Sequence, residues 1–431
     1  MDTLVDVLWG AGGMLVLLGI AVLCSTNRRA IRPRTVLAAL ALQVGFGVVV
    51  LFWSVGQRGL EAASSGVQAV IDSSREGIAF LFGPLIPEEG QVFALQVLPV
   101  IIFFASLTAV LYHLGVLQRV VAVLGGGLGR LLGTEHAESV NAAANIFVGQ
   151  TEAPLVIRPY ISRLSRSGLF AVMVGGLSTV AGSVLVGYSL LGARLDYLIA
   201  ASFMAAPGAL LMAKIMVPED DEEAVAAERE RVRAEAGRGT RNDADAGGRD
   251  TEGESDGEQR ARNVIDAAAA GAADGLRLAA TIGAMLLAFI SLIALLNLLL
   301  GGVAGWFGAE DLTIEQILGW LFSPLMAAIG VPWGEAVQAG SFVGQKIVLN
   351  EFVAFSDLGP VIDELSPKTA AITTFAITGF ANLGSLGILL GGLGGLAPAR
   401  RPEIASLGLR AVLAATLANL MSAAIAGILL G

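Results

Sequence analysis

Two glutamates stand out because each lies in a stretch that is otherwise nearly free of charge. Glu152 lies in GQTEAP and Glu351 lies in LNEFVAF. An ionisable side chain at membrane depth is costly, and it marks a binding or transport site by default. A structural role is the alternative, in which either carboxylate pairs with Lys346, Arg158 or backbone amides to hold its segment closed.

Neutral oxygen donors form a second group of candidates. Asn145, Thr179, Asn382 and Ser385 carry amide and hydroxyl groups close to glycine-rich interruptions of apolar runs. Hard cations such as sodium prefer oxygen ligands, and an unwound helix adds free backbone carbonyls. These residues therefore indicate a cation site and a polar substrate site. For Thr179, a hydrogen bond to the preceding turn is the structural alternative.

The elements that carry these residues occur twice. Two segments, 138–161 and 335–357, both contain FVGQ and are too polar to span a membrane, and a Gly/Ser-rich break follows each of them, at 175–183 and 378–387. Backbone that leaves a helix at membrane depth must be buried in protein or line a wet cavity. Paired interruptions of this kind indicate a binding site between inverted repeats. The sequence predicts two re-entrant hairpins whose tips meet two broken helices.

The remaining apolar runs are long enough to cross a bilayer, which takes roughly 20 residues per helix. Because acidic residues precede the first run, it is expected to remain as a membrane helix instead of being cleaved as a signal peptide. We expect an all-α polytopic membrane protein with about eight transmembrane helices plus the two hairpins. The candidate spans are 8–25, 36–54, 91–117, 168–191, 196–217, 278–302, 369–392 and 405–430.

Charge is concentrated in one segment. Of 431 residues, 55% are hydrophobic and 15% are charged, with a formal net charge of −10. Residues 218–262 hold 15 acids and 8 arginines, which is −7 of that total. This composition predicts a solvated, largely disordered linker. No basic surface is left elsewhere, which excludes nucleic acid as a partner.

Arginines set the expected orientation, because cytoplasmic loops collect basic residues near helix ends. Four arginines at 28–34 follow the first span and place that loop inside. The N- and C-termini are then expected on the periplasmic side of a cell inner membrane, with linker 218–262 in the cytoplasm. An Ala-rich helix at 263–280 is expected to lie at the membrane interface before the next span.

Catalytic motifs are not found. The single Cys24 excludes an internal disulfide, and two isolated histidines do not make a zinc site. The chain has no P-loop, and no histidine lies beside a nucleophile in the sequence. The sequence therefore predicts that the protein is not an enzyme and that ATP does not drive it.

Several motifs together resemble the concentrative nucleoside transporters. They are GQTEAPLVIRPY at 149–160, KIVLNEFVAF at 346–355, AITGFANLGSLGI at 376–388 and GAMLLAFISLIALLN at 283–297. The resemblance runs from about residue 88 to the C-terminus, the linker excepted. It implies a homotrimer whose protomers each have a scaffold and a transport domain that moves like an elevator. It further implies symport of nucleosides, such as uridine or adenosine, with sodium as the coupling ion or, in some members, protons.

The resemblance also implies a domain plan. It gives scaffold helices in 1–117, a first transport half in 118–217, linker 218–262, an interfacial and a scaffold helix in 263–303, and a second transport half in 304–431.

Site residues carried over from the family fall into two sets. Implied nucleoside contacts are Gln150, Thr151 and Glu152 for the base, Glu351, Asn382 and Ser385 for the ribose, and Phe380 for packing. Implied sodium ligands are the side chains of Asn145 and Thr179 with the carbonyls of Val148 and Val180. The chemistry agrees, since ribose hydroxyls suit carboxylate and amide partners and a base edge suits mixed donors and acceptors. Proton coupling through Glu152 or Glu351, and a non-transporting receptor or channel, are the alternatives.

Overall fold

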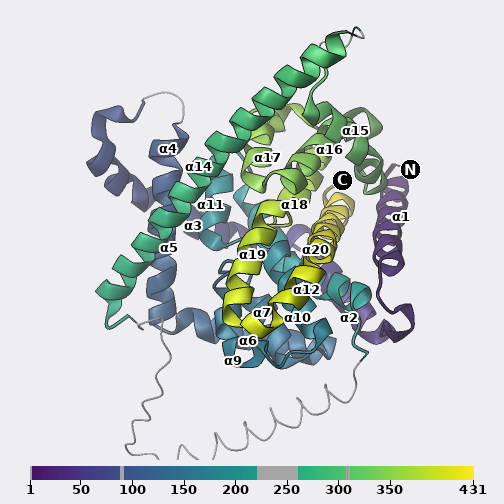
Figure 1. The fold of residues 1–431 in the computed structure, drawn as a ribbon, viewed down its shortest axis with the longest axis horizontal. Helices are drawn as coiled ribbons and strands as arrows, with labels where there is room; N and C mark the ends of the chain where they lie inside the picture. The colour runs from purple at the N-terminus through teal and green to yellow at the C-terminus, as the bar shows by residue number, and fades with distance from the viewer. Residues whose placement is uncertain (1, 88–91, 221–260, 307, 309–310) are drawn as a thin grey trace, which may run out of the picture.

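The computed structural model describes residues 2–87, 92–220, 261–306, 308 and 311–431, and in these ranges the only regular secondary structure is helical (Figure 1). The expected all-α membrane fold is therefore present. In chain order the α-helices are α1 (Asp2–Leu23), α2 (Pro33–Gly47), α3 (Ser54–Phe82), α4 (Phe93–Gln96), α5 (Leu98–His113), α6 (Val116–Leu132), α7 (His136–Ala144), α8 (Ala153–Val156), α9 (Arg158–Ile161), α10 (Arg166–Ser178), α11 (Gly182–Leu190), α12 (Leu195–Met216), α14 (Val264–Gly305), α15 (Ile314–Ala328), α16 (Trp333–Val348), α17 (Glu351–Leu358), α18 (Pro367–Ile377), α19 (Leu383–Leu396) and α20 (Arg401–Leu430). Short helical turns are η1 (Arg28–Ala30), η2 (Val48–Phe52), η3 (Gly83–Leu85), η4 (Gly359–Glu364) and η5 (Pro398–Arg400).

Six of the described helical segments are long and apolar enough to cross a membrane, and a seventh span is possible if α15 and α16 count together. That pair bends by 118° at its break, as expected for a broken span or a re-entrant loop. The six are Pro33–Phe52, Phe93–His113, Arg166–Leu190, Leu195–Met216, Val264–Gly305 and Pro398–Leu430.

The same order of elements occurs twice in the chain. In the first half, α7 and the short helices α8 and α9 form a hairpin, α10 and α11 form a broken helix, and α12 is continuous. In the second half, α16 and α17 form the hairpin, α18 and α19 the broken helix, and α20 the continuous helix. The breaks coincide with the glycine-rich interruptions of the sequence.

The long helix α14 runs diagonally across one face of the molecule and packs along α5 (Figure 1). Glycines allow this close approach, because a Cβ at Gly271 would lie 2.8 Å from the carbonyl oxygen of Ala105 and one at Gly275 would lie 2.8 Å from the Cα of Ile102. The separate interfacial helix expected at 263–280 is not formed. These residues continue without a break into the apolar span, and no proline interrupts them.

Helices α1 and α2 lie away from that pair. They pack against α12 and α20, with Gln43 donating a 2.9 Å hydrogen bond to the hydroxyl of Ser422. A Cβ at Gly10 would collide with the side chain of Ile428. Helix α5, which falls in the same expected scaffold range 1–117, packs on α14 instead.

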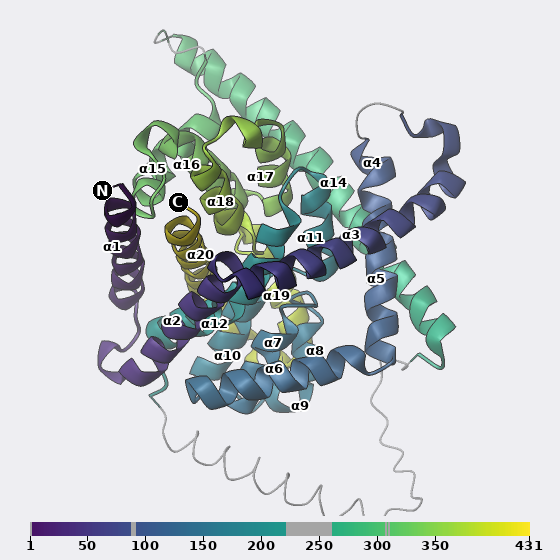
Figure 2. The same cartoon turned by 180° about the vertical axis from the view of Figure 1, so that it is seen from behind.

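Three arginine-bearing segments (residues 24–34, 162–166 and 397–401) meet residues 217–220 at one end of the molecule, and we call these four segments together the arginine-rich face. Thr26 N donates to Met216 O at 2.9 Å, the Ser165 hydroxyl donates to Glu219 at 2.7 Å, and the Arg400 guanidinium donates to Ile161 O at 3.1 Å. Both chain termini lie at the opposite end (Figures 1 and 2). The expected disorder of the acidic linker concerns residues 221–260, which lie outside the described residues.

Three described helices have no counterpart among the predicted elements. Helix α3 crosses the back of the molecule, α6 lies beside α7, and α15 packs along α16 (Figure 2). Helices α6 and α15, of 17 and 15 residues, are too short to span a bilayer alone, and α3 carries charged residues along its length.

Candidate functional site

The two helix breaks touch each other inside the molecule. Residues 179–181 separate α10 from α11, and residues 378–382 separate α18 from α19. The backbone N–H of Phe380 donates to the carbonyl of Thr179 at 3.3 Å, which joins the breaks directly. Gly379 has φ +146°, a conformation that side chains with a Cβ rarely adopt. The two predicted helix breaks are therefore in direct contact with each other.

Of the four residues expected to bind the ribose or to pack against the nucleoside, three lie together. Asn382 caps the start of α19, and its Nδ2 donates to Glu351 Oε2 at 2.8 Å. The Asn382 Oδ1 accepts from the backbone N–H of Ser385 at 2.7 Å, so one amide side chain positions both neighbours. All three residues are buried, and Glu351 is 4% exposed. Phe380, the fourth, is half-buried in the adjoining break.

Local helix signals explain why Glu351 is held in place. Asn350 caps the start of α17, because its Oδ1 accepts from Val353 N at 2.9 Å. Glu351 is thus the first residue of the helix, where a carboxylate is favoured by the exposed N–H groups. The Tyr188 ring stacks on Phe355 with centroids 4.5 Å apart, and its hydroxyl interacts with the Glu351 carboxylate without forming a well-aligned hydrogen bond.

The tip of the first hairpin lies between two other helices. A Cβ at Gly176 of α10 would lie 3.0 Å from the Gln150 Cβ, and one at Gly392 of α19 would lie 3.3 Å from the Thr151 Cγ2. Glu152 is exposed, and it accepts from the Thr151 hydroxyl at 3.1 Å in its own turn. Its carboxylate is therefore not tied to the Glu351 pair in this conformation, and the pairing with Lys346 or Arg158 considered above is not formed.

The residues expected to bind a cation also come together. Gly182 N donates to Phe147 O at 3.1 Å, so the end of the first hairpin helix lies against the first break. Val148 and Val180 both lie outside helices there. The Asn145 Nδ2 donates to Asn141 O at 3.0 Å, and its Oδ1 is buried without a partner. A buried acceptor without a donor suits a cation or water.

Thr179 makes the hydrogen bond that was the structural alternative. Its hydroxyl donates to Gly175 O at 2.8 Å. That bond uses the hydroxyl proton and leaves oxygen lone pairs able to accept from water or coordinate a cation. Both interpretations of Thr179 are therefore compatible with the geometry.

A buried polar link that sequence reasoning missed joins hairpin 2 to the first break. The fully buried Lys346 Nζ donates to Asn419 Oδ1 at 3.0 Å. The Asn419 Nδ2 in turn donates to Ser178 O at 2.7 Å, at the last residue of α10. The signal for Asn419 was present, since an asparagine inside an otherwise apolar span is costly unless it is paired.

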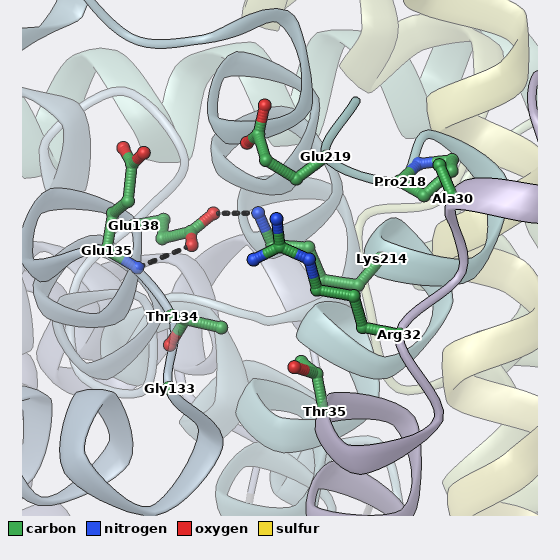
Figure 3. Close-up of a pocket in the computed structure, with 10 residues that line it drawn as sticks. All are labelled: Ala30, Arg32, Thr35, Gly133, Thr134, Glu135, Glu138, Lys214, Pro218 and Glu219. Carbon is green, nitrogen blue, oxygen red and sulfur yellow. Dashed lines mark hydrogen bonds and ion pairs between the residues drawn. The ribbon is translucent and has the colours of Figure 1, made fainter. Parts of the chain in front are cut away.

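A pocket opens at the arginine-rich face beside the base of hairpin 1 (Figure 3). Lys214 from α12 forms a 2.7 Å ion pair with Glu138 Oε2 of α7 and donates to the Ser167 hydroxyl at 3.1 Å. The Glu138 Oε1 accepts from Glu135 N at 2.7 Å, which closes a capping box at the start of α7. These buried charges were not among the predicted site residues.

Comparison with known proteins gives matches along nearly the whole chain. Family models match residues 12–85 (Na+ dependent nucleoside transporter N-terminus), 94–195 (nucleoside recognition) and 197–427 (Na+ dependent nucleoside transporter C-terminus). The chain is 53% identical to an uncharacterized transporter, YutK, of Bacillus subtilis, covering 98% of this chain and 99% of the relative. It is 46% identical to the nucleoside permease NupC of Helicobacter pylori, covering 98% of both chains.

Solved structures of one transporter, CNTnw, also match. The inward-facing substrate-bound state has a TM-score of 0.88 at 51% identity and covers 98% of both chains. An outward-facing state of a substituted form has a TM-score of 0.88 at 50% identity and covers 98% of this chain and 97% of that one.

Proposed function

This chain belongs to the Na+ dependent nucleoside transporter family, and from that membership we propose that it imports nucleosides by sodium symport. Its relatives are transporters and permeases, and the protein is accordingly a multi-pass membrane transporter and not an enzyme. The contacts of the described residues support the assignment of the cation and of the residues that bind nucleoside.

The buried Glu351–Asn382 pair is the observation that carries the nucleoside assignment. A ribose hydroxyl can donate to a carboxylate and accept from an amide, so two adjacent hydroxyls match these two side chains with Ser385 beside them. An analogue without a hydroxyl would leave buried groups unpaired, which gives strong discrimination. Phe380, half-buried in the adjoining break, would pack against the nucleoside.

The base is assigned to the tip of hairpin 1. Gln150, Thr151 and Glu152 offer donors and acceptors, and the buried Gln150 Oε1 has no partner. Because Glu152 is exposed and bonded only within its own turn, it can turn toward a base without breaking a buried pair.

For the cation, support comes from the neutral oxygens around the first break. Asn145 Oδ1 and the Thr179 hydroxyl, together with the carbonyls of Val148 and Val180, supply oxygen ligands of the kind that sodium prefers. Coupling follows if the ion favours the conformation that also binds nucleoside, since a ligand shifts an equilibrium only through differential affinity. Hairpin 1 contributes to both proposed sites, which would link them.

The moving parts follow from the packing. We assign α5 and α14 to a static scaffold that forms the centre of a homotrimer, because α14 is largely exposed along its apolar length. The hairpins, broken helices, α12 and α20 would move as an elevator, and α1 and α2 would move with the helices they pack against. The arginine-rich face is assigned to the cytoplasm of a cell inner membrane, which puts both termini outside.

Uptake into proteoliposomes tests this proposal. Labelled uridine, adenosine and guanosine would be offered with an inward sodium gradient, with choline in its place, and with an inward proton gradient. Concentrative uptake that requires sodium and is unchanged by pH supports sodium symport. Uptake driven by the proton gradient alone would assign proton coupling instead, and saturable binding without accumulation would indicate a receptor.

A further inference from the structure

Asn141 is a buried amide whose side chain has no described partner. It is 0% exposed on α7, and neither its Nδ2 nor its Oδ1 makes a hydrogen bond. Leaving such groups unpaired destabilises the folded protein. A side chain with both polar atoms unsatisfied is expected to be paired by something that the chain itself does not supply.

The surroundings of Asn141 are continuous with the proposed coupling site. A Cβ at Gly175 would lie 3.4 Å from the Nδ2 atoms of both Asn141 and Asn145, so both amides face the same glycine. The Gly175 carbonyl accepts from the Thr179 hydroxyl, and the Asn141 carbonyl accepts from Asn145 Nδ2. Because Gly175 has no side chain, both amides approach the backbone of α10 at this point.

At its other end this polar row reaches the pocket of Figure 3. Glu138, Asn141 and Asn145 are spaced by three and four residues, which places them on one face of α7. All three are buried, and Glu138 is paired with Lys214 at 2.7 Å. From Glu138 to Asn145 is about 10 Å along the helix axis.

We propose that Asn141 forms a second position for the transported monovalent cation, between the coupling site at Asn145 and the pocket at the arginine-rich face. This inference rests on the proposed sodium symport. Asn141 Oδ1 is a neutral oxygen ligand that can hold a cation during passage without trapping it. The Lys214 ammonium closes the pocket end, because it already neutralises the carboxylate that would attract the ion. In this conformation a cation at Asn141 can therefore exchange with the site at Asn145 but not with the pocket.

The test uses three variants of the full chain in proteoliposomes. Asn141→Leu removes the oxygen at similar volume, and Asn141→Asp keeps the shape and adds a carboxylate. Ser139→Ala is the matched control, because Ser139 is equally buried on α7 but bonds to Thr134 and Glu135. For each variant the sodium concentration that gives half-maximal uridine uptake is measured, with uridine binding in sodium-free buffer measured separately.

Asn141→Leu is expected to raise the half-maximal sodium concentration about tenfold, because one polar ligand is lost. Uridine binding in sodium-free buffer is expected to stay within about twofold of wild type. Asn141→Asp is expected to lower that concentration, increasingly so as pH rises and the carboxyl ionises. A residue that only packs would not give this gain, and Ser139→Ala should behave as wild type.

An unchanged sodium requirement in Asn141→Leu overturns this inference while sodium symport stands. Uptake by the wild type that ignores sodium overturns both. If Asn141→Leu does not fold, Asn141→Asp decides the matter, and a weaker sodium response at high pH would contradict the proposal.

Discussion

The Asn382 amide donates a 2.8 Å hydrogen bond to the Glu351 carboxylate, although the two residues are 31 positions apart and lie at the starts of different helices. One residue comes from the second hairpin and the other from the second helix break. Because both are buried, neither group is satisfied by solvent once the other is removed. The contact therefore fixes the second hairpin relative to the second helix break at the place assigned to the sugar.

Removal of this carboxylate should abolish nucleoside binding. Glu351→Ala is expected to lose detectable uridine binding, and Glu351→Gln to weaken it by about tenfold or more, because a hydrogen bond to a charged acceptor is worth about 1.5–3 kcal/mol. Calorimetry on detergent-purified protein would measure both, and size-exclusion chromatography would check that the oligomer is kept. Wild-type affinity in Glu351→Ala would contradict the ribose assignment. Glu76→Gln, on the exposed side of α3, serves as the control and should change nothing.

The glycine of the second break should not tolerate a side chain. Gly379 has φ +146°, and a Cβ there would lie 2.5 Å from Asn419 Oδ1 and 2.7 Å from Ser178 O. Gly379→Ala is therefore expected to cost about 2 kcal/mol or more and to abolish uptake, because the contact between the two breaks must shift. Gly387→Ala on the neighbouring α19 is the matched control, since nothing lies within 4 Å of its Cβ position. Equal uptake by the two variants would show that the break tolerates this change.

The buried lysine of hairpin 2 should matter through its charge. Lys346→Met leaves Asn419 Oδ1 without its donor and removes a buried cation that acts electrostatically on the Glu351 carboxylate, a loss of about 1–3 kcal/mol. We expect a lower melting temperature in detergent. Adding Glu351→Gln to Lys346→Met should recover part of the loss, because the uncompensated charge is then gone. Identical melting temperatures for the single and double variants would exclude this electrostatic coupling.

Much of the site was predictable because membrane depth makes polar residues conspicuous. Glu351, Asn382 and Ser385 stood out from apolar surroundings, and the structure gathers them. The breaks were equally visible as glycine and serine within apolar runs. Amphipathic helices such as α3 were missed, since their charged residues separate them from the apolar runs by which membrane spans are identified.

Pairings between distant residues could not be predicted in the same way. Asn141 and Asn419 were visible as polar residues, yet their environments depend on which helices pack together. Helices α1 and α2 pack against α12 and α20. The pattern of apolar residues could not predict this, because it does not indicate which neighbouring helix an apolar helix packs against. The continuity of α14 depended on its glycines fitting against α5 and not on a change in polarity near residue 280.

A comparison of two threonines can distinguish a cation ligand from an ordinary hydrogen bond within a helix. Thr179 donates to Gly175 O at 2.8 Å and Thr374 donates to Ala370 O at 2.7 Å, so each hydroxyl bonds to the carbonyl four residues earlier, and both residues are buried. Only Thr179 lies at the proposed cation site, beside Asn145. Valine keeps the shape and removes the hydroxyl in either case.

Thr179→Val is therefore expected to raise the sodium concentration for half-maximal uridine uptake about tenfold, as one oxygen ligand is lost. Thr374→Val should leave the sodium requirement within about twofold of wild type, because a hydroxyl bonded back to its own helix contributes at most a small free energy. Uptake in proteoliposomes over a sodium series, with choline keeping ionic strength constant, measures both. If the two variants shift the sodium requirement equally, the Thr179 hydroxyl is only a helix hydrogen bond, and the cation must be held by Asn145 and the backbone carbonyls.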